Sequence, residues 1–179
     1  MTLLIAFRGP YRFLSNDSWC TVTWKGVEYP SVTHAFQCAQ TFDKAKQEEI
    51  KKTKRFTRVR RIGKTALQRP GWEKIQLAVL ESLLRQKFAQ PKFRQVLLST
   101  KDYKLINGDH RGETYWGMIY HCHKWLGENH LGKLLMKIRE DIQKEEAGIT
   151  AKSPPLKPMT TSPPIPDRNA SACFSTHNS

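Results

Sequence analysis

The fold of this chain is decided by residues 20–52, CTVTWKGVEYPSVTHAFQCAQTFDKAKQEEIKK. Apolar side chains alternate on both sides of Lys25-Gly26, and this pattern predicts a β-hairpin over residues 20–29. Pro30 ends the hairpin, and Ser31 is a suitable N-cap for one long helix that takes up the rest of the stretch. A small hairpin that leads straight into a helix is typical of the α+β class.

Apolar residues at helical spacing predict three further helices downstream. The first runs from Trp72 to Phe88, a short second one begins at Pro91, and the last covers about Leu131 to Glu145. The sequence has no alternating βαβ pattern and no internal repeat. We therefore expect a single compact α+β domain that is mostly helical and has a small β component.

The composition of the chain changes sharply near its C-terminus. Six of the ten prolines lie between residues 154 and 166, and the sequence beyond them has almost no large apolar side chains. Such a segment buries too little surface to offset the entropy of ordering it. The sequence thus predicts a folded domain over residues 1–147 and a disordered Pro/Ser/Thr-rich tail over residues 148–179.

The positive charge of the protein is concentrated in one part of the domain. The 30 Lys and Arg against 16 Asp and Glu give a net charge of +14, and residues 44–104, with 18 basic and 5 acidic side chains, account for +13 of it. Residues 51–69 hold nine cations and no acid. Unpaired cations repel one another, which favours an anionic partner: a nucleic acid backbone, a nucleotide or a sugar phosphate.

The remaining composition argues against several classes of protein. No run of apolar residues is long enough to span a membrane, and the N-terminus has the wrong charge order for a secretory signal. The cysteines Cys20, Cys38, Cys122 and Cys173 are widely spaced and predict free, buried thiols in a cytoplasmic protein. His121-Cys122-His123 fits no metal-ligand spacing, so no metal and no cofactor are predicted.

Several short segments occur in an order that points to one family. They are FRGPYRFLSN (7–16), GVEYPSVTHAFQ (26–37), Ile-Gly-Lys (62–64), Trp72-Glu73, LLRQKFAQPKFRQVLLST (83–100), Tyr-Trp-Gly (115–117) and NHLGKLLMKIR (129–139). Together they resemble the NADAR domain family of YbiA-like N-glycosidases over about residues 7–141.

This resemblance implies an enzyme that hydrolyses the N-glycosidic bond of a phosphorylated riboside. Members of the family act on phosphorylated intermediates of the riboflavin pathway, and others remove ADP-ribose from modified guanine. Cleavage of a ribosyl C–N bond builds positive charge on the anomeric carbon, which a nearby carboxylate stabilises. Aromatic rings stack on the base, and Arg or Lys side chains hold the phosphate.

The resemblance also assigns individual residues to these roles. Glu113 is the expected catalytic carboxylate, with Asp109 as a further acid nearby. Arg60 or Arg61 would assist Lys64 in holding the phosphate, and Tyr115 adds a ring. The substrate-binding side chains that the resemblance implies are Phe13, Asn16, Thr33, His34, Lys64, Trp72, Trp116 and Asn129.

The chain departs from the family pattern at its acidic positions. Thr33 and Asn107 stand where the family usually carries Glu, and Glu113 and Lys64 replace an Asp and an Arg. Because Thr cannot ionise, two hypotheses stay open: hydrolysis that depends on Glu113, or a domain that only binds ligands such as ADP-ribose or NAD. A nucleic-acid-binding module that uses residues 51–69 is a third.

Four of the assigned side chains also have an ordinary structural interpretation. His34, Trp72 and Trp116 are residue types that commonly pack in a core, and Asn129 is a suitable cap for the last helix. The sequence alone does not choose between these roles.

Overall fold

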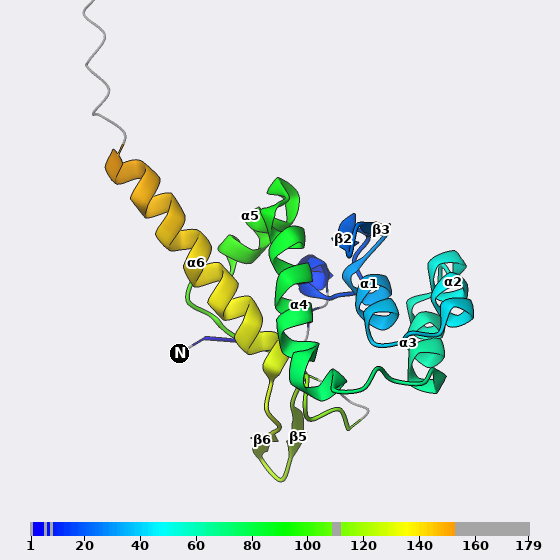
Figure 1. Cartoon of the computed structure of the whole chain (residues 1–179). Helices are drawn as coiled ribbons and strands as arrows, with labels where there is room; N and C mark the ends of the chain where they lie inside the picture. The colour runs from blue at the N-terminus through cyan, green and yellow to red at the C-terminus, as the bar shows by residue number, and fades with distance from the viewer. Residues whose placement is uncertain (1, 6, 8, 109–111, 153–179) are drawn as a thin grey trace, which may run out of the picture.

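The computed structural model describes residues 2–5, 7, 9–108 and 112–152. Figure 1 shows α4 (Trp72–Ala89) at the centre, with α5 (Pro91–Ser99) and α6 (His130–Lys152) on one side and α1 (Val32–Ala39) on the other. The helix α6 continues five residues past the predicted boundary at 147. The remainder of the predicted tail, residues 153–179, lies outside the described residues.

The predicted hairpin and the helix cap after it are confirmed. β2 (Val22–Trp24) pairs antiparallel with β3 (Val27–Tyr29), and the turn residues Lys25 and Gly26 both have left-handed backbones, with φ of 50° and 76°. The Ser31 side chain accepts a hydrogen bond from the backbone N–H of His34 and so begins α1.

The prediction of one long helix over residues 31–52 is wrong. The helix α1 ends at Ala39, and α2 (Lys44–Lys52) begins after a new N-cap, Asp43. Between them the Thr41 hydroxyl donates to the Leu67 carbonyl at 2.8 Å, and Thr41 pairs with Gln68 in an isolated β-bridge. These contacts with a distant segment outweigh the local helical preference.

The basic stretch forms a helix that the periodicity did not predict. This helix, α3 (Phe56–Thr65), packs against α1 and α2. The helices α4 and α5 occupy the ranges expected from apolar spacing, and α6 is longer than expected at its C-terminal end. The prediction of a mostly helical α+β domain is confirmed.

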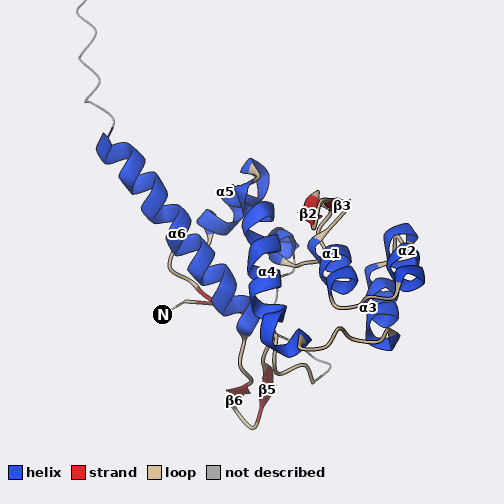
Figure 2. Ribbon diagram, viewed as in Figure 1, coloured by secondary structure: helices blue, strands red, loops and turns tan. Residues whose placement is uncertain are grey.

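The strands form three separate pairs (Figure 2). Besides the β2–β3 hairpin, β1 (Leu3–Ile5) lies parallel to β4 (Lys104–Ile106), and β5 (Ile119–His121) pairs antiparallel with β6 (Lys124–Leu126). A 3-10 helix, η1 (Gly9–Leu14), follows β1. Among the described helices, none is both long and apolar enough to cross a membrane.

Three of the four cysteines lie in the described residues, and all three are free thiols. Cys20 and Cys38 are buried, as predicted, and burial raises the pKa of Cys38 to about 12. Cys122 is exposed because it lies in the β5–β6 turn with a φ of 46°, so the prediction of a buried thiol is wrong there. Cys173 lies outside the described residues.

Candidate functional site

A cleft of about 750 Å³ is formed by parts of the chain that are distant in sequence. They are the segment after η1, the helices α1 and α3, and the segment that follows β4, with one residue each from α4 and α6. The lining residues are Ser15, Asn16, Asp17, Thr33, Phe36, Gln37, Thr57, Arg60, Arg61, Lys64, Leu80, Asn107, Gly108, Gly112, Glu113, Trp116 and Leu131.

Five of the residues predicted for the site line this one cleft: Asn16, Thr33, Lys64, Glu113 and Trp116. They come from four of the motif segments and from the stretch just before Tyr-Trp-Gly. The fold thus brings together acidic, cationic, amide and aromatic groups that are up to 100 positions apart in sequence. The predicted acid Asp109 lies outside the described residues.

Two of the other predicted residues are buried and do not line the cleft. His34 is fully buried, with Nδ1 2.7 Å from the Ser31 hydroxyl and Nε2 2.8 Å from the Thr53 carbonyl. Both ring nitrogens are therefore used to join the start of α1 to the end of α2. Trp72 is 3% exposed and packs against Phe36, so it supports a lining ring from behind.

Asn129 also supports the cleft without lining it. Its Oδ1 accepts a hydrogen bond from the Asn107 backbone N–H at 3.0 Å, and its Nδ2 donates to the Leu105 carbonyl at 2.9 Å. The side chain thereby ties the end of β4 to the start of α6. Its backbone is left-handed, with a φ of 55°.

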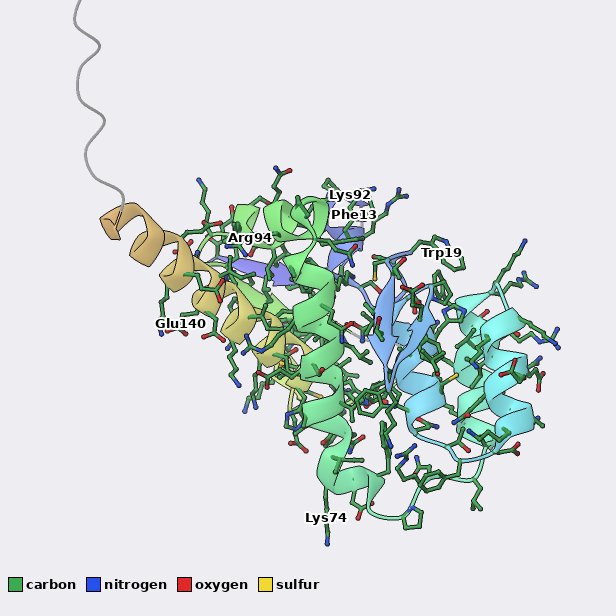
Figure 3. The ribbon with its side chains drawn as sticks, turned by 45° about the horizontal axis from the view of Figure 1, so that its top comes forward. Phe13, Trp19, Lys74, Lys92, Arg94 and Glu140 are labelled. Carbon is green, nitrogen blue, oxygen red and sulfur yellow. The ribbon has the colours of Figure 1, made fainter. Side chains whose placement is uncertain are left out.

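Phe13 lies in a neighbouring hollow of about 500 Å³. Figure 3 shows it beside Lys92, whose ammonium group lies 4.8 Å from the ring centroid. Ser15 and Asp17 line both this hollow and the main cleft, so the two adjoin.

Three cations of α3 form what we call the cationic wall: Arg60, Arg61 and Lys64. The helix approaches α1 closely because residue 63 is glycine. A Cβ atom at Gly63 would lie 1.7 Å from Gln37 Oε1, and the Gly63 carbonyl accepts a hydrogen bond from the Gln40 side chain. Lys64, the last residue of the Ile-Gly-Lys motif, lines the cleft.

The charges of the basic stretch are partly compensated by acidic side chains outside it. Lys51 pairs with Glu48 and Arg58 with Glu49 on the outer side, at 2.8 and 3.4 Å. Arg60 pairs with Asp17.

Glu113, Trp116 and Asn107 form what we call the amide wall. Glu113 Oε1 accepts hydrogen bonds from the backbone N–H groups of Tyr115 and Trp116, at 2.9 and 3.3 Å. Asn107 Nδ2 donates to the Trp116 carbonyl. A Cβ atom at Gly117 would lie 2.3 Å from the Asn107 carbonyl oxygen, which explains the glycine after the tryptophan.

The aromatic part of the cleft is fixed by ring packing. The Trp116 ring meets Phe36 at 5.5 Å and Tyr115 at 4.8 Å between centroids, both edge to face. Such a ring is held in place before any ligand arrives, and it offers an apolar surface to a planar base.

Asn16 contributes an acceptor whose hydrogen-bonding capacity is not used within the described chain. Its Oδ1 atom is buried and makes no hydrogen bond to the described residues. A buried amide oxygen without a partner is costly, so it favours a ligand that brings a hydroxyl or N–H group.

Sequence reasoning missed the carboxylate of Asp17, which also lines the cleft. The residue follows directly after the FRGPYRFLSN segment, and no periodicity marks it. Its partner Arg60 is 43 positions away, so only the folded chain shows their contact.

Comparisons with known proteins agree on one family. The NADAR domain profile matches residues 6–143. A riboflavin biosynthesis protein of Vibrio vulnificus is 34% identical over 136 residues, which cover 73% of this chain and 35% of the Vibrio protein. The chain thus spans about a third of that relative.

The N-glycosidase YbiA of Escherichia coli K12 is similar over most of its length. It is 31% identical over 139 residues, which cover 76% of this chain and 84% of YbiA. The NMR structure of E. coli YbiA superposes with a TM-score of 0.68 and 29% sequence identity, covering 82% of this chain and 88% of that structure.

Proposed function

This chain belongs to the NADAR domain family, and from that premise we propose that it hydrolyses the N-glycosidic bond of a phosphorylated riboside. The observation that carries the proposal is the composition of one cleft: the carboxylate of Glu113, the cationic wall of α3 and the ring of Trp116 lie together. A riboside phosphate needs all three groups.

The cationic wall supplies the phosphate site. Arg60, Arg61 and Lys64 present guanidinium and ammonium donors within one stretch of α3, and such donors form charge-assisted hydrogen bonds with phosphate oxygens. The rings of Trp116 and Phe36 accept the base, and Asn16 Oδ1 accepts a hydrogen bond from a hydroxyl or N–H group.

Glu113 supplies the negative charge for the reacting carbon. As the C–N bond lengthens, positive charge develops on C1′ of the ribose, and a nearby carboxylate lowers the energy of that state. The two backbone N–H groups that bind Oε1 hold the carboxylate in one orientation before the substrate arrives.

The substrates that best fit these groups are an ADP-ribosyl-guanine unit in nucleic acid and a phosphorylated ribosylamino compound of riboflavin biosynthesis. Each combines a base, a ribose and a phosphate. The first would also bring a polynucleotide to the outer face of residues 51–69. There the pairs Lys51–Glu48 and Arg58–Glu49 compensate two of the nine cations of residues 51–69.

A domain that binds such a ligand without hydrolysing it is the second candidate. The observation that favours it is the chemistry of Thr33 and Asn107, which line the cleft with neutral side chains. Either candidate keeps the same ligand class, so turnover distinguishes them.

The test uses liquid chromatography to measure release of the free base from the phosphorylated ribosylamino compound and release of ADP-ribose from ADP-ribosylated guanine in nucleic acid. We expect turnover by the wild-type protein and a loss of about 100-fold or more in Glu113→Gln, the range for removal of a catalytic acid–base group. The exposed Glu28→Gln is the matched control. Unchanged turnover in Glu113→Gln would remove this residue from the mechanism.

A wild-type protein that binds ribose phosphates without turnover, and that gains turnover on Thr33→Glu, would establish the binding-only function. Binding to an unmodified oligonucleotide, with an affinity that falls steeply as salt rises, would instead favour a nucleic-acid-binding module.

A further inference from the structure

Asp17 has the geometry of a second functional carboxylate in the cleft. Its side chain is about one-third exposed, lines the main cleft and contacts groups from two different helices. Thr33 Oγ1, on α1, donates to Asp17 Oδ1 at 2.8 Å, and Arg60 Nη1, on α3, lies 2.5 Å from both carboxylate oxygens.

Thr33 holds this carboxylate in place. It is 5% exposed, and its backbone N–H donates to the Asn16 carbonyl, so α1 and the segment of Asp17 are joined twice. The position that lacks a carboxylate of its own thus binds the carboxylate of a neighbouring segment.

Arg60, in contrast, can leave Asp17 and bind the phosphate of a substrate. Its guanidinium lines the cleft next to Arg61 and Lys64, where a phosphate would bind. A phosphate monoester carries more negative charge than a carboxylate and forms strong, often bidentate pairs with Arg. A bound phosphate therefore competes with Asp17 for Arg60, while the Thr33 hydrogen bond keeps Asp17 in place.

We propose that Asp17 is a second catalytic residue of the cleft, held by Thr33 and released from Arg60 when the phosphate of the substrate binds. This inference rests on the proposed hydrolysis and assigns the group that activates water. It also explains how the cleft works with a threonine at position 33.

In the proposed step, Asp17 activates the water molecule that attacks C1′ of the ribose. The oxygen of a water molecule bonds to C1′ while the C1′–N bond breaks and its electron pair leaves with the base nitrogen. One proton of that water passes to Asp17, which later returns it to the solvent, and the departing nitrogen takes a proton from the solvent. The ribosylamino substrate and one water molecule become the free base and a ribose phosphate, whereas ADP-ribosyl-guanine and one water molecule become the unmodified guanine of the nucleic acid and ADP-ribose.

The first experiment separates chemistry from binding in Asp17→Asn. We expect kcat to fall by about 100-fold or more, since a general base is lost. The affinity for ribose 5-phosphate, measured by calorimetry, should stay the same or rise. In this variant Arg60 does not have to break an ion pair with Asp17 before it binds the phosphate. Asp102→Asn, an exposed Asp outside the cleft, is the matched control.

A second experiment transfers the carboxylate. In the Asp17→Asn background, Thr33→Glu should raise kcat by about tenfold or more, because it returns a carboxylate to the same part of the cleft. In the wild type, Thr33→Glu should lower kcat, because two carboxylates would then lie side by side. This reversal of sign is not expected of a structural salt bridge.

A third variant keeps the proposal testable if Asp17→Asn does not fold. Thr33→Val removes only the hydroxyl that binds Asp17, and it should lower kcat by about tenfold with KM unchanged, the size expected for loss of one orienting hydrogen bond.

Other results would overturn the proposal. If Asp17→Asn keeps wild-type kcat, or loses phosphate affinity along with kcat in a folded protein, Asp17 is a structural partner of Arg60 and the proposed hydrolysis stands. If the wild type hydrolyses neither substrate, the proposed function fails, and the role of Asp17 fails with it.

Discussion

The two walls of the cleft are built in different ways. The amide wall is held by hydrogen bonds of Asn107, Glu113 and Asn129 with the backbone, and by the close approach of Gly117 to the backbone of Asn107. The cationic wall consists of long charged side chains on α3, and Arg60 is held there by the ion pair with Asp17.

This difference separates two tasks. A wall fixed by backbone contacts suits a group that must stay aligned with the reacting carbon, because catalysis tolerates little misplacement. A wall of Arg and Lys side chains can adjust to a phosphate at low cost. The comparison predicts that damage to the amide wall acts on stability, whereas damage to the cationic wall acts on ligand affinity.

The largest effect should come from Asn129→Ala in the support of the amide wall. The change leaves the Asn107 N–H and the Leu105 carbonyl without partners and places Ala at a φ of 55°, so we expect a loss of about 3 kcal/mol in unfolding free energy. Urea unfolding followed by circular dichroism measures it.

Asn129→Gly is the matched variant, since it loses the same hydrogen bonds without the backbone strain. It should be less destabilised than Asn129→Ala by about 1 kcal/mol. Equal stability of Asn129→Ala and the wild type would mean that the amide wall does not depend on this side chain.

A smaller, pH-dependent effect concerns the support behind Asp17. Lys87 of α4 is fully buried, its ammonium group donates to the Ser15 carbonyl at 2.6 Å, and burial lowers its pKa to about 8 from an ordinary 10.5. Between pH 8 and 10.5 the unfolded chain binds a proton that the folded chain has lost. Burial of the charged Lys87 therefore lowers the unfolding free energy by its full amount below pH 8. This loss disappears as the pH rises to about 10.5.

We accordingly expect Lys87→Met to be more stable relative to the wild type at pH 7 than at pH 10, by roughly 2 kcal/mol. Unfolding curves of both proteins at the two pH values measure this difference. The comparison between proteins is necessary because burial raises the pKa of the Cys38 thiol from 9.0 to about 12. That thiol makes the unfolding free energy fall as the pH rises from about 9 to 12, a range that overlaps the range of Lys87. A difference that is independent of pH would contradict a charged Lys87 at neutral pH.

The smallest effect on the fold should come from Lys64→Ala in the cationic wall. We expect no change in unfolding free energy and a loss of about tenfold in affinity for ribose 5-phosphate, near 1.4 kcal/mol, because one phosphate donor is removed. Calorimetric titration measures the affinity. Lys74→Ala, which alters a lysine of α4 outside the cleft, should leave it unchanged. Destabilisation by Lys64→Ala would show that the two walls do not divide their tasks in this way.

The sequence predicts some of the helices well and others poorly. The ranges of α4 and α5 followed from apolar spacing, because each buries one continuous face. The break between α1 and α2 did not, because it depends on the contact of Thr41 with residues 67 and 68. The helix α3 was also missed, since its charged residues hide the pattern of Val59, Ile62 and Gly63 that it buries.

The candidate site shows the same division. Motif order placed Asn16, Thr33, Lys64, Glu113 and Trp116 in one set, and all five line the cleft. The same reasoning put His34, Trp72 and Asn129 among the ligand-binding residues, and none of the three lines the cleft. Trp72 packs against Phe36 and Asn129 binds Asn107, both of which line it, whereas His34 binds Ser31 and Thr53. In the sequence, a motif residue that contacts a ligand cannot be told from one that supports a ligand-contacting residue.

The sequence by itself determined the family, the α+β class and the location of the positive charge, because these depend on residue types and their spacing along the chain. Only the tertiary structure decided how the charges are paired. The contact of Asp17 with Arg60 and Thr33 joins three segments that carry no common local signal. Their partnership arises from the packing of α1 against α3, which the close approach at Gly63 permits.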